Sequence, residues 1–246
     1  MRSRDAPNLI DINNLRVACS SCSLRELCLP AGLDTGEMEQ MDRLVTRRRR
    51  LKRGADLYRA GEALAALYAI RSGFMKSCVL HDDGREQVAG FHMAGDLLGL
   101  DAIGGGSHTC DTVALEDTEV CEIPFASLEQ LSRELPSLQH QLHRIMSREI
   151  VRDYGVMLLL GSMSAEERLA AFLLNLSQRF AARGYSPSEF RLRMTREEMG
   201  SYLGLKLETV SRTLSAFQER GLLSVRQKQV RILDASGLKA VLDQKR

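Results

Sequence analysis

The residues best suited to chemistry are three cysteines crowded into one short segment. Cys19, Cys22 and Cys28 follow the spacing C-x2-C-x5-C, which allows a flexible leader to bring three thiolates to one centre. A fourth ligand would come from Cys78, Cys110 or Cys121. Spacing alone leaves both an iron–sulfur cluster and zinc open. The cluster is favoured, because structural zinc sites usually pair two short Cys/His knuckles and the sequence has no second one.

The number and placement of the cysteines indicate a compartment. Six cysteines in 246 residues, three of them within ten positions, do not form an extracellular disulfide framework. The longest aliphatic run, Val156 to Leu160, is far shorter than the roughly 20 residues that a membrane span needs, and the N-terminus is polar. We therefore expect a reducing cytoplasm, with neither secretion nor membrane insertion.

A second chemical signal is the charge of the C-terminal third. The net charge is +2, yet residues 162–246 carry an excess of +6 and residues 1–161 an excess of −4. Such asymmetry makes nucleic acid a candidate partner of the basic end.

The basic segment contains the pattern of a winged helix-turn-helix. Thr195 with Glu198 predicts a capping box that opens a helix to about Leu203, Gly204 makes the turn, and residues 207–220 form a second helix. Two short strands, 223–225 and 230–233, then predict a wing. An amphipathic helix over residues 164–183 precedes this motif.

The second helix carries side chains suited to base edges. Glu208, Ser211 and Arg212 share an exposed face near its N-terminus, where arginine pairs with guanine and glutamate accepts from cytosine. Phosphate contacts are expected from Lys206, Arg226 and Lys228.

The central region positions the cysteines. Residues 51–125 hold ten of the 19 glycines between short alternating segments, which predicts an antiparallel sandwich or jelly roll. Residues 82–85 are typical of a hairpin turn, and the basic run 47–50 is interpreted as a solvated stretch before a strand.

A long helix over residues 137–160 follows. Its apolar positions step by 4, 3, 4 and 3 residues, as in a two-stranded coiled coil with one carboxylate in the seam. The seam consists of Met146, Ile150, Asp153, Met157 and Leu160. Self-association is favoured over packing within the chain's own domain.

The predicted class is therefore α+β. It comprises a Cys-rich leader (1–30), an antiparallel β-roll or jelly roll (31–135), a dimerisation helix (136–161) and a winged helix (162–246).

The sequence resembles the FNR-type regulators of the CRP/FNR superfamily over nearly its whole length. The matching motifs are the cysteine leader ending at 28–30 and the segments 68–73, 90–97, 120–125, 165–170, 202–205 and 208–212. The resemblance implies a transcription factor, not an enzyme, that holds an oxygen-labile [4Fe-4S] cluster through Cys19, Cys22, Cys28 and Cys121. Cys78 and Cys110 fall outside the family's ligand positions.

The resemblance also implies partners. We expect a homodimer on an inverted repeat with half-sites like TTGAT, and RNA polymerase contacting the hairpin His81, Asp82, Asp83, Gly84 and Arg85. Cyclic nucleotide is not expected, because the stretch 107–110 lacks the arginine that grips the phosphate in related readers. A zinc- or thiol-based redox regulator of the same fold remains an alternative; an iron–sulfur electron carrier would need a partner or substrate pocket that the sequence does not reveal.

Overall fold

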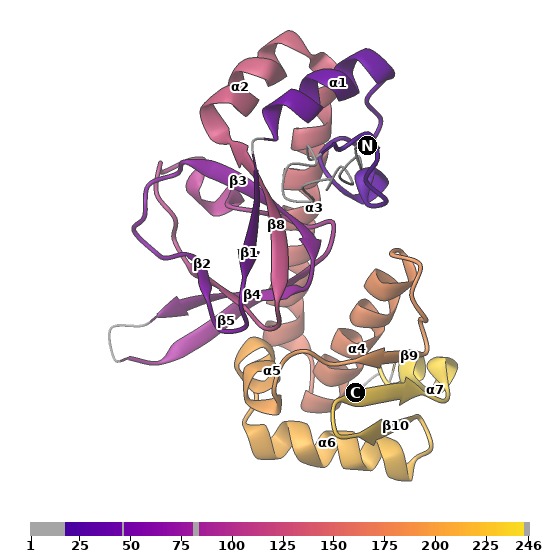
Figure 1. Cartoon of the computed structure of the whole chain (residues 1–246). Coiled ribbons are helices and arrows are strands. Elements are labelled where there is room, and N and C mark those ends of the chain that lie inside the picture. The colour runs from indigo at the N-terminus through magenta and orange to yellow at the C-terminus, as the bar shows by residue number, and fades with distance from the viewer. Residues whose placement is uncertain (1–17, 46, 81–83, 244–246) are drawn as a thin grey trace, which may run out of the picture.

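The three-dimensional structure is a computed structural model that describes residues 18–45, 47–80 and 84–243. It confirms the α+β class: a β-roll, a long helix and a C-terminal helix-turn-helix with a small sheet follow one another along the chain (Figure 1).

The β-roll consists of two four-stranded antiparallel sheets. The first has the order β1 (Arg47–Leu51), β8 (Thr118–Pro124), β3 (Ala66–Ser72) and β6 (Leu97–Leu98). The second has the order β2 (Asp56–Tyr58), β7 (Asp111–Ala114), β4 (Phe74–Leu80) and β5 (Glu86–Met93). Buried aliphatic side chains from both sheets meet between them, as expected for alternating strands.

The basic run Arg47–Arg50 corrects one expectation. It is not a solvated stretch before a strand but most of edge strand β1 itself. Arg47 pairs with Glu122 at 2.9 Å, and Arg48 lies 3.4 Å from Glu119, so carboxylates of the neighbouring strand β8 balance the charge.

Short helices complete the roll. The leader contains a 3-10 turn, η2 (Arg25–Leu27), and is followed by α1 (Thr35–Leu44), which starts with a capping box at Asp34. A second 3-10 turn, η3 (Leu100–Ala102), precedes β7, and α2 (Phe125–Glu134) follows β8. In Figure 1, α1 and α2 lie together at the end of the roll where the leader is found.

Helix α3 (Pro136–Ser162) runs beside the β-roll toward the C-terminal domain (Figure 1). Its first half buries Leu138, Gln141 and Ile145 against the leader, α1 and α2, whereas most of its second half faces solvent. The long uninterrupted helix predicted from the sequence is confirmed.

A two-residue joint connects α3 to the next domain. Met163 and Ser164 are extended, and Ser164 caps α4 (Ala165–Ala181) with a capping box to Glu167. The remaining elements are β9 (Glu189–Arg191), α5 (Arg196–Leu203), α6 (Leu207–Glu219), β10 (Leu223–Arg226), β11 (Gln229–Ile232) and α7 (Ala235–Ala240).

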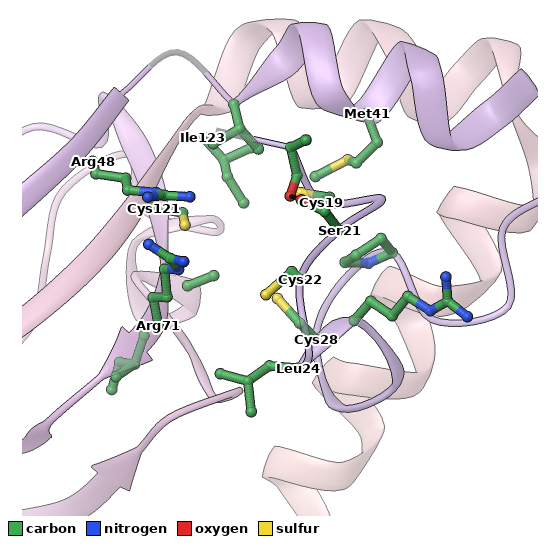
Figure 2. Close-up of a pocket in the computed structure, with 16 residues that line it drawn as sticks. Cys19, Ser21, Cys22, Leu24, Cys28, Met41, Arg48, Arg71, Cys121 and Ile123 are labelled. Carbon is green, nitrogen blue, oxygen red and sulfur yellow. Dashed lines mark hydrogen bonds between the residues drawn. The ribbon is translucent and has the colours of Figure 1, made fainter. Parts of the chain in front are cut away.

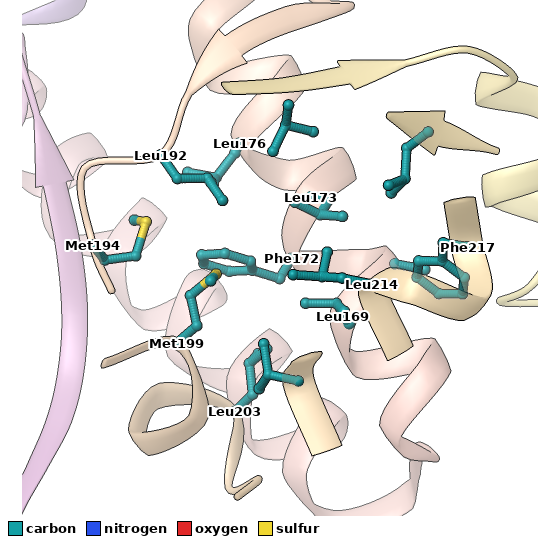
Figure 3. Close-up of a cluster of buried hydrophobic side chains, with 14 of the residues drawn as sticks. Leu169, Phe172, Leu173, Leu176, Leu192, Met194, Met199, Leu203, Leu214 and Phe217 are labelled. Carbon is teal, nitrogen blue, oxygen red and sulfur yellow. The ribbon is translucent and has the colours of Figure 1, made fainter. Parts of the chain in front are cut away.

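The C-terminal domain has a dense apolar core, shown in Figure 3. Phe172 and Leu173 of α4 contribute to the same cluster as Leu214 and Phe217 of α6, and each is at most 5% exposed. Burying a side chain of this size contributes about 1.5–3 kcal/mol, so the helices hold one another in place without help from a ligand.

Candidate metal centre and nucleic-acid interface

Four cysteines line one pocket between the leader and the β-roll. Cys19, Cys22 and Cys28 reach it from the leader, and Cys121 reaches it from β8. Figure 2 shows the leader thiols on one side and Cys121 on the other, with Met41 of α1 nearby. The sequence-predicted ligand set is therefore brought together around one cavity.

Successive turns shape the leader around this cavity. The amide of Cys22 donates to the carbonyl of Cys19 at 3.0 Å, that of Arg25 donates to Cys22 at 3.2 Å, and that of Cys28 donates to Leu24 at 3.1 Å. A chain that reverses direction every three or four residues keeps closely spaced side chains near one another. The C-x2-C-x5-C spacing thus becomes a compact arrangement of thiols.

Two contacts tie the leader to helices. Asp42 of α1 accepts from the Ser20 hydroxyl at 2.6 Å and also from the amides of Cys19 and Ser20. The amide Nε2 of Gln141, which is 5% exposed on α3, donates to the carbonyl of Cys28 at 3.3 Å. The ligand loop therefore touches the long helix directly.

The pocket favours neutral thiols. Burial, aided by the neighbouring cysteines, raises the pKa of Cys19 to about 12, and burial likewise raises that of Cys28 to about 12. Burial also raises the pKa of Cys121, although Arg48 and Arg71 oppose the shift. Thiols this close ionise together only when a bound cation compensates their charge, which is what a thiophilic metal supplies.

The separation of the thiols bears on which centre fits. Within residues 18–45, 47–80 and 84–243, no group of three or more Cys, His, Asp or Glu side chains is close enough to hold one metal ion. A single zinc ion requires all sulfurs about 2.3 Å from one point. The four thiols that line the pocket match the all-cysteine donor set of a [4Fe-4S] cluster, which takes one thiolate at each iron.

Neither of the other cysteines lines this pocket. Both are buried, Cys78 in strand β4 and Cys110 in the loop before β7. The Cys78 sulfur lies 3.8 Å from the Asp111 carbonyl, and the Cys110 sulfur lies 3.7 Å from an Asp101 carboxylate oxygen. Burial raises both pKa values to about 12. Their burial away from the pocket makes them suitable controls for the four pocket cysteines.

The helix-turn-helix forms as the sequence predicts. Thr195 and Glu198 make the capping box of α5, and Gly204 takes the left-handed conformation at the turn, with φ of 62°. A Cβ on Gly200 would lie 2.5 Å from the carbonyl oxygen of Leu205, so only glycine allows the two helices to cross this closely.

The base-reading candidates lie on the open face of α6. Glu208 and Arg212 are exposed, and half-buried Ser211 accepts a hydrogen bond from Arg196 at 3.3 Å. Among the phosphate candidates, Lys206 and Arg226 are exposed. Lys228 instead donates from Nζ to the carbonyl of Arg193 at 3.0 Å, so its ammonium group also connects the wing to the segment before α5.

The predicted seam of α3 lies only partly at the surface. Ile150, Asp153 and Met157 are exposed, and Leu160 is 37% exposed although it lies close to Gly204 of the helix-turn-helix, whereas Met146 is half-buried. Three further apolar side chains are 58–65% exposed beside the seam and were missed by the sequence reasoning: Val151, Tyr154 and Leu158. Positions 147, 151, 154 and 158 are spaced by 4, 3 and 4 residues, and this coiled-coil spacing in the sequence could have revealed the second exposed face.

Two other segments singled out from the sequence are the hairpin at residues 81–85 and the stretch 107–110. Strands β4 and β5 pair Leu80 with Glu86, so a hairpin joins them; His81, Asp82 and Asp83 lie outside the described residues, and Gly84 and Arg85 are exposed. In the stretch 107–110, His108 is buried and stacks on Tyr58 with ring centroids 3.6 Å apart.

Comparisons with known proteins agree with this layout. A Crp-like helix-turn-helix domain matches residues 167–241, and a cyclic nucleotide-binding domain matches residues 48–134. The fumarate and nitrate reduction regulatory protein of Salmonella typhimurium is 49% identical over 92% of this chain and 90% of its own. The protein of the same name from Escherichia coli K12 is 50% identical over 88% of this chain and 86% of its own.

Solved structures share the fold. FixK2 from Bradyrhizobium japonicum superposes with a TM-score of 0.75 at 32% identity, over 80% of this chain and 98% of its own. TTHB099, a CRP-family transcriptional regulator from Thermus thermophilus, superposes with a TM-score of 0.63 at 22% identity, over 80% of this chain and 97% of its own. Within the described residues, no helix is long and apolar enough to cross a membrane.

Proposed function

Because this chain belongs to the FNR-type transcription regulators of the CRP/FNR superfamily, we propose that it senses oxygen and binds palindromic DNA as a homodimer only while a [4Fe-4S] cluster is intact. It is a DNA-binding regulator and not an enzyme. The observation that carries the proposal is the convergence of four cysteines on one pocket beside the long helix. Its place of action would be the cytoplasm.

Cys19, Cys22, Cys28 and Cys121 would hold the cluster. When bound, it supplies an oxygen-labile cross-link between the leader and β8. The contacts of the leader then become persistent: Asp42 holds its start, and Gln141 holds the carbonyl of Cys28. Since Gln141 belongs to α3, ordering the leader stabilises the helix that forms the dimer.

The dimer would form along the exposed apolar face of α3. Ile150, Val151, Met157 and their neighbours leave water when two copies pair, whereas Asp153 meets its symmetry mate. In the described residues Asp153 forms no ion pair, since Arg152 pairs with Glu149 instead. The repulsion between the two carboxylates weakens the cluster-free dimer, which makes pairing conditional.

Pairing would place two α6 helices about one DNA turn apart, on half-sites like TTGAT. Arg212 would read the guanine and Glu208 the opposing cytosine, while Lys206, Arg226 and Lys228 contact phosphates. The hairpin that contains residues 81–85 would contact RNA polymerase; substitutions at Gly84 or Arg85 that lower transcription but leave DNA binding intact would support this contact, and unchanged transcription across the turn would refute it.

The deciding experiment is anaerobic purification, followed by iron and sulfide analysis and a visible spectrum before and after air. About four irons and four sulfides per chain, an absorption band that bleaches in air, and a parallel loss of operator binding are expected. A protein that contains zinc, or one without metal whose DNA binding follows thiol oxidation, would favour the zinc- or thiol-based alternative.

A further inference from the structure

The turn between β5 and β6 is covered on one side by the leader and on the other by the DNA-binding domain. A Cβ built on Gly95, whose φ is 92°, would lie 3.0 Å from Cβ of Leu27 in the leader. Leu27, Gly95 and Asp96 line one cleft together with Arg179 and Arg183 from the end of α4. Three segments far apart in the sequence therefore meet here.

Asp96 binds the DNA-binding domain through two arginines. One carboxylate oxygen lies 2.5 Å from Arg179 and the other 2.7 Å from Arg183. The guanidinium of Arg179 also donates to the carbonyl of Phe91, and that of Arg183 donates to the carbonyl of Ala94. Arg179 thus holds the backbone of β5 and Arg183 that of the turn, in addition to the Asp96 carboxylate.

The ion pairs are removed from water. The side chains of Asp96, Arg179 and Arg183 are only 8–17% exposed. Burial alone would raise the pKa of Asp96, yet the two guanidinium groups hold it below its usual range, so the carboxylate stays charged. Removing one partner from such a buried set leaves uncompensated charge, which makes the contact far more consequential than a surface pair.

The leader lies directly on this contact. Leu27 immediately precedes Cys28, and its side chain lies against Gly95, the residue next to Asp96. A constraint placed on Cys28 therefore acts on the turn through one side chain.

The clamped arrangement is compatible with DNA binding. While the arginines hold the turn, α5 packs on β5, where the Ser201 hydroxyl accepts from the amide of Val88 at 2.8 Å. Glu208 and Arg212 of α6 remain exposed. The clamp orients the domain without covering its reading face.

We propose that Asp96 is a positioning residue that transmits the state of the cysteine leader to the DNA-binding domain within a single chain. This proposal rests on the proposed function, because the leader must be ordered by a cluster. It adds a route from the cysteine leader to the DNA-binding domain that does not pass through the dimer interface on α3. A packed turn with ion pairs on its far side is the kind of contiguous network that can carry such coupling.

The test is hydrogen exchange on the full chain kept monomeric by Ile150→Glu, which places a charge on the exposed face of α3. Cluster-loaded and cluster-free protein are compared in peptides covering residues 93–97 and 176–183. We expect loading to slow exchange in both segments. Equal exchange of residues 176–183 with and without the cluster would overturn the proposal. Absence of the visible band would instead contradict the proposed function.

Two variants and a control locate the route. Leu27→Ala should keep the band but abolish the cluster-dependent protection of residues 176–183, and Asp96→Asn should do the same. In the dimeric chain, Asp96→Asn should weaken operator binding by about 2- to 30-fold at unchanged cluster content and dimerisation. The control is Glu116→Gln, which removes another interdomain pair, 3.0 Å from Arg193, and should retain the protection. Retained protection in both Leu27→Ala and Asp96→Asn would contradict the route.

Discussion

The cysteine leader and the DNA-reading helix α6 both carry chemistry, but they are held in place in different ways. Helix α6 buries Val210, Leu214 and Phe217 in a core with α4, each at most 2% exposed. The leader buries Leu29, packs Leu27 against Gly95, and is held further by polar contacts from Asp42 and Gln141. The DNA-binding domain is held by its own core, and on the proposed function the cysteine leader would gain order when a cluster cross-links its thiols.

This difference explains how a small group can control a large domain. A segment held by a few hydrogen bonds, each contributing about 0.5–1.5 kcal/mol, gains order when four covalent ligations are added. A segment held by a full hydrophobic core does not respond to so local a change. In the proposed mechanism, control would therefore act on dimerisation and domain orientation and leave the fold of the DNA-binding domain intact.

The largest expected effect follows from removing a ligand. Cys19→Ser, Cys22→Ser, Cys28→Ser or Cys121→Ser should abolish cluster retention and anaerobic operator binding, because a hydroxyl is a poor substitute for a thiolate. Iron content and a gel-shift assay measure both. Cys78→Ser and Cys110→Ser are the matched controls and should retain both properties. An essential Cys110 with a dispensable Cys121 would show the ligand assignment to be wrong.

Asp153→Ala should uncouple the reader from the sensor. Removing the two facing carboxylates relieves a repulsion of several kcal/mol, on the scale of the about 5.5 kcal/mol that shifts an equilibrium from 1:99 to 99:1. The variant should sediment as a dimer and bind its operator in air. Ser147→Ala, an uncharged change on the same exposed stretch of α3, should stay monomeric in air. An aerobic Asp153→Ala monomer, where anaerobic wild type is dimeric, contradicts this role.

Phe217→Ala tests whether the reader is independently folded. The side chain is fully buried, so truncation should lower the free energy of unfolding of the DNA-binding domain by about 3–5 kcal/mol. Denaturant unfolding followed by circular dichroism measures it. The visible band of the cluster should persist, since the cysteine pocket contains no residue of this core. Loss of the band would mean that the two regions are not separable.

Arg212→Ala should give the smallest effect and the most specific. It should cost about 1–3 kcal/mol per half-site and relax the preference at one base pair, because a bidentate contact to guanine is lost. Competition binding with operator and random DNA measures the loss. Arg226→Ala is the preferred phosphate control and should weaken all sequences alike. Lys228→Ala should also do so, but it additionally releases the Arg193 carbonyl. An equal loss on both DNAs for Arg212→Ala would remove it from the base-reading set.

Local signals made most of the fold predictable. The capping box at Thr195, the turn at Gly204 and the periodicity of α3 depend on residues within a few positions of one another, and each was found from the sequence. The run at Arg47 was misinterpreted because its partner strand β8 lies about 70 residues away. A strand rich in arginine is stable only when such a partner supplies carboxylates.

The candidate site was predictable in its members but not in its surroundings. The cysteine spacing and the family resemblance supplied the four thiols that line the pocket. The hydrogen bond from Gln141 and the clamp at Asp96 join residues 83 to 113 positions apart, and nothing local in the sequence marks them. The hydrogen bond of Lys228 could not be predicted for the same reason, because its acceptor, the carbonyl of Arg193, is distant in the sequence.

The two-residue joint at Met163 and Ser164 has a mechanical consequence. Helix α4 extends about 25 Å from the joint, and its far end carries the arginines that grip Asp96. At that distance from the joint, a displacement of the helix end by about 1 Å corresponds to a rotation of the domain by only about 2°. A rotation of about 10° would displace the helix end by about 4 Å, which is slightly more than one base step of DNA. Restraint at the far end of α4, together with the packing of α5 on β5, therefore limits how far the angle of α6 can change.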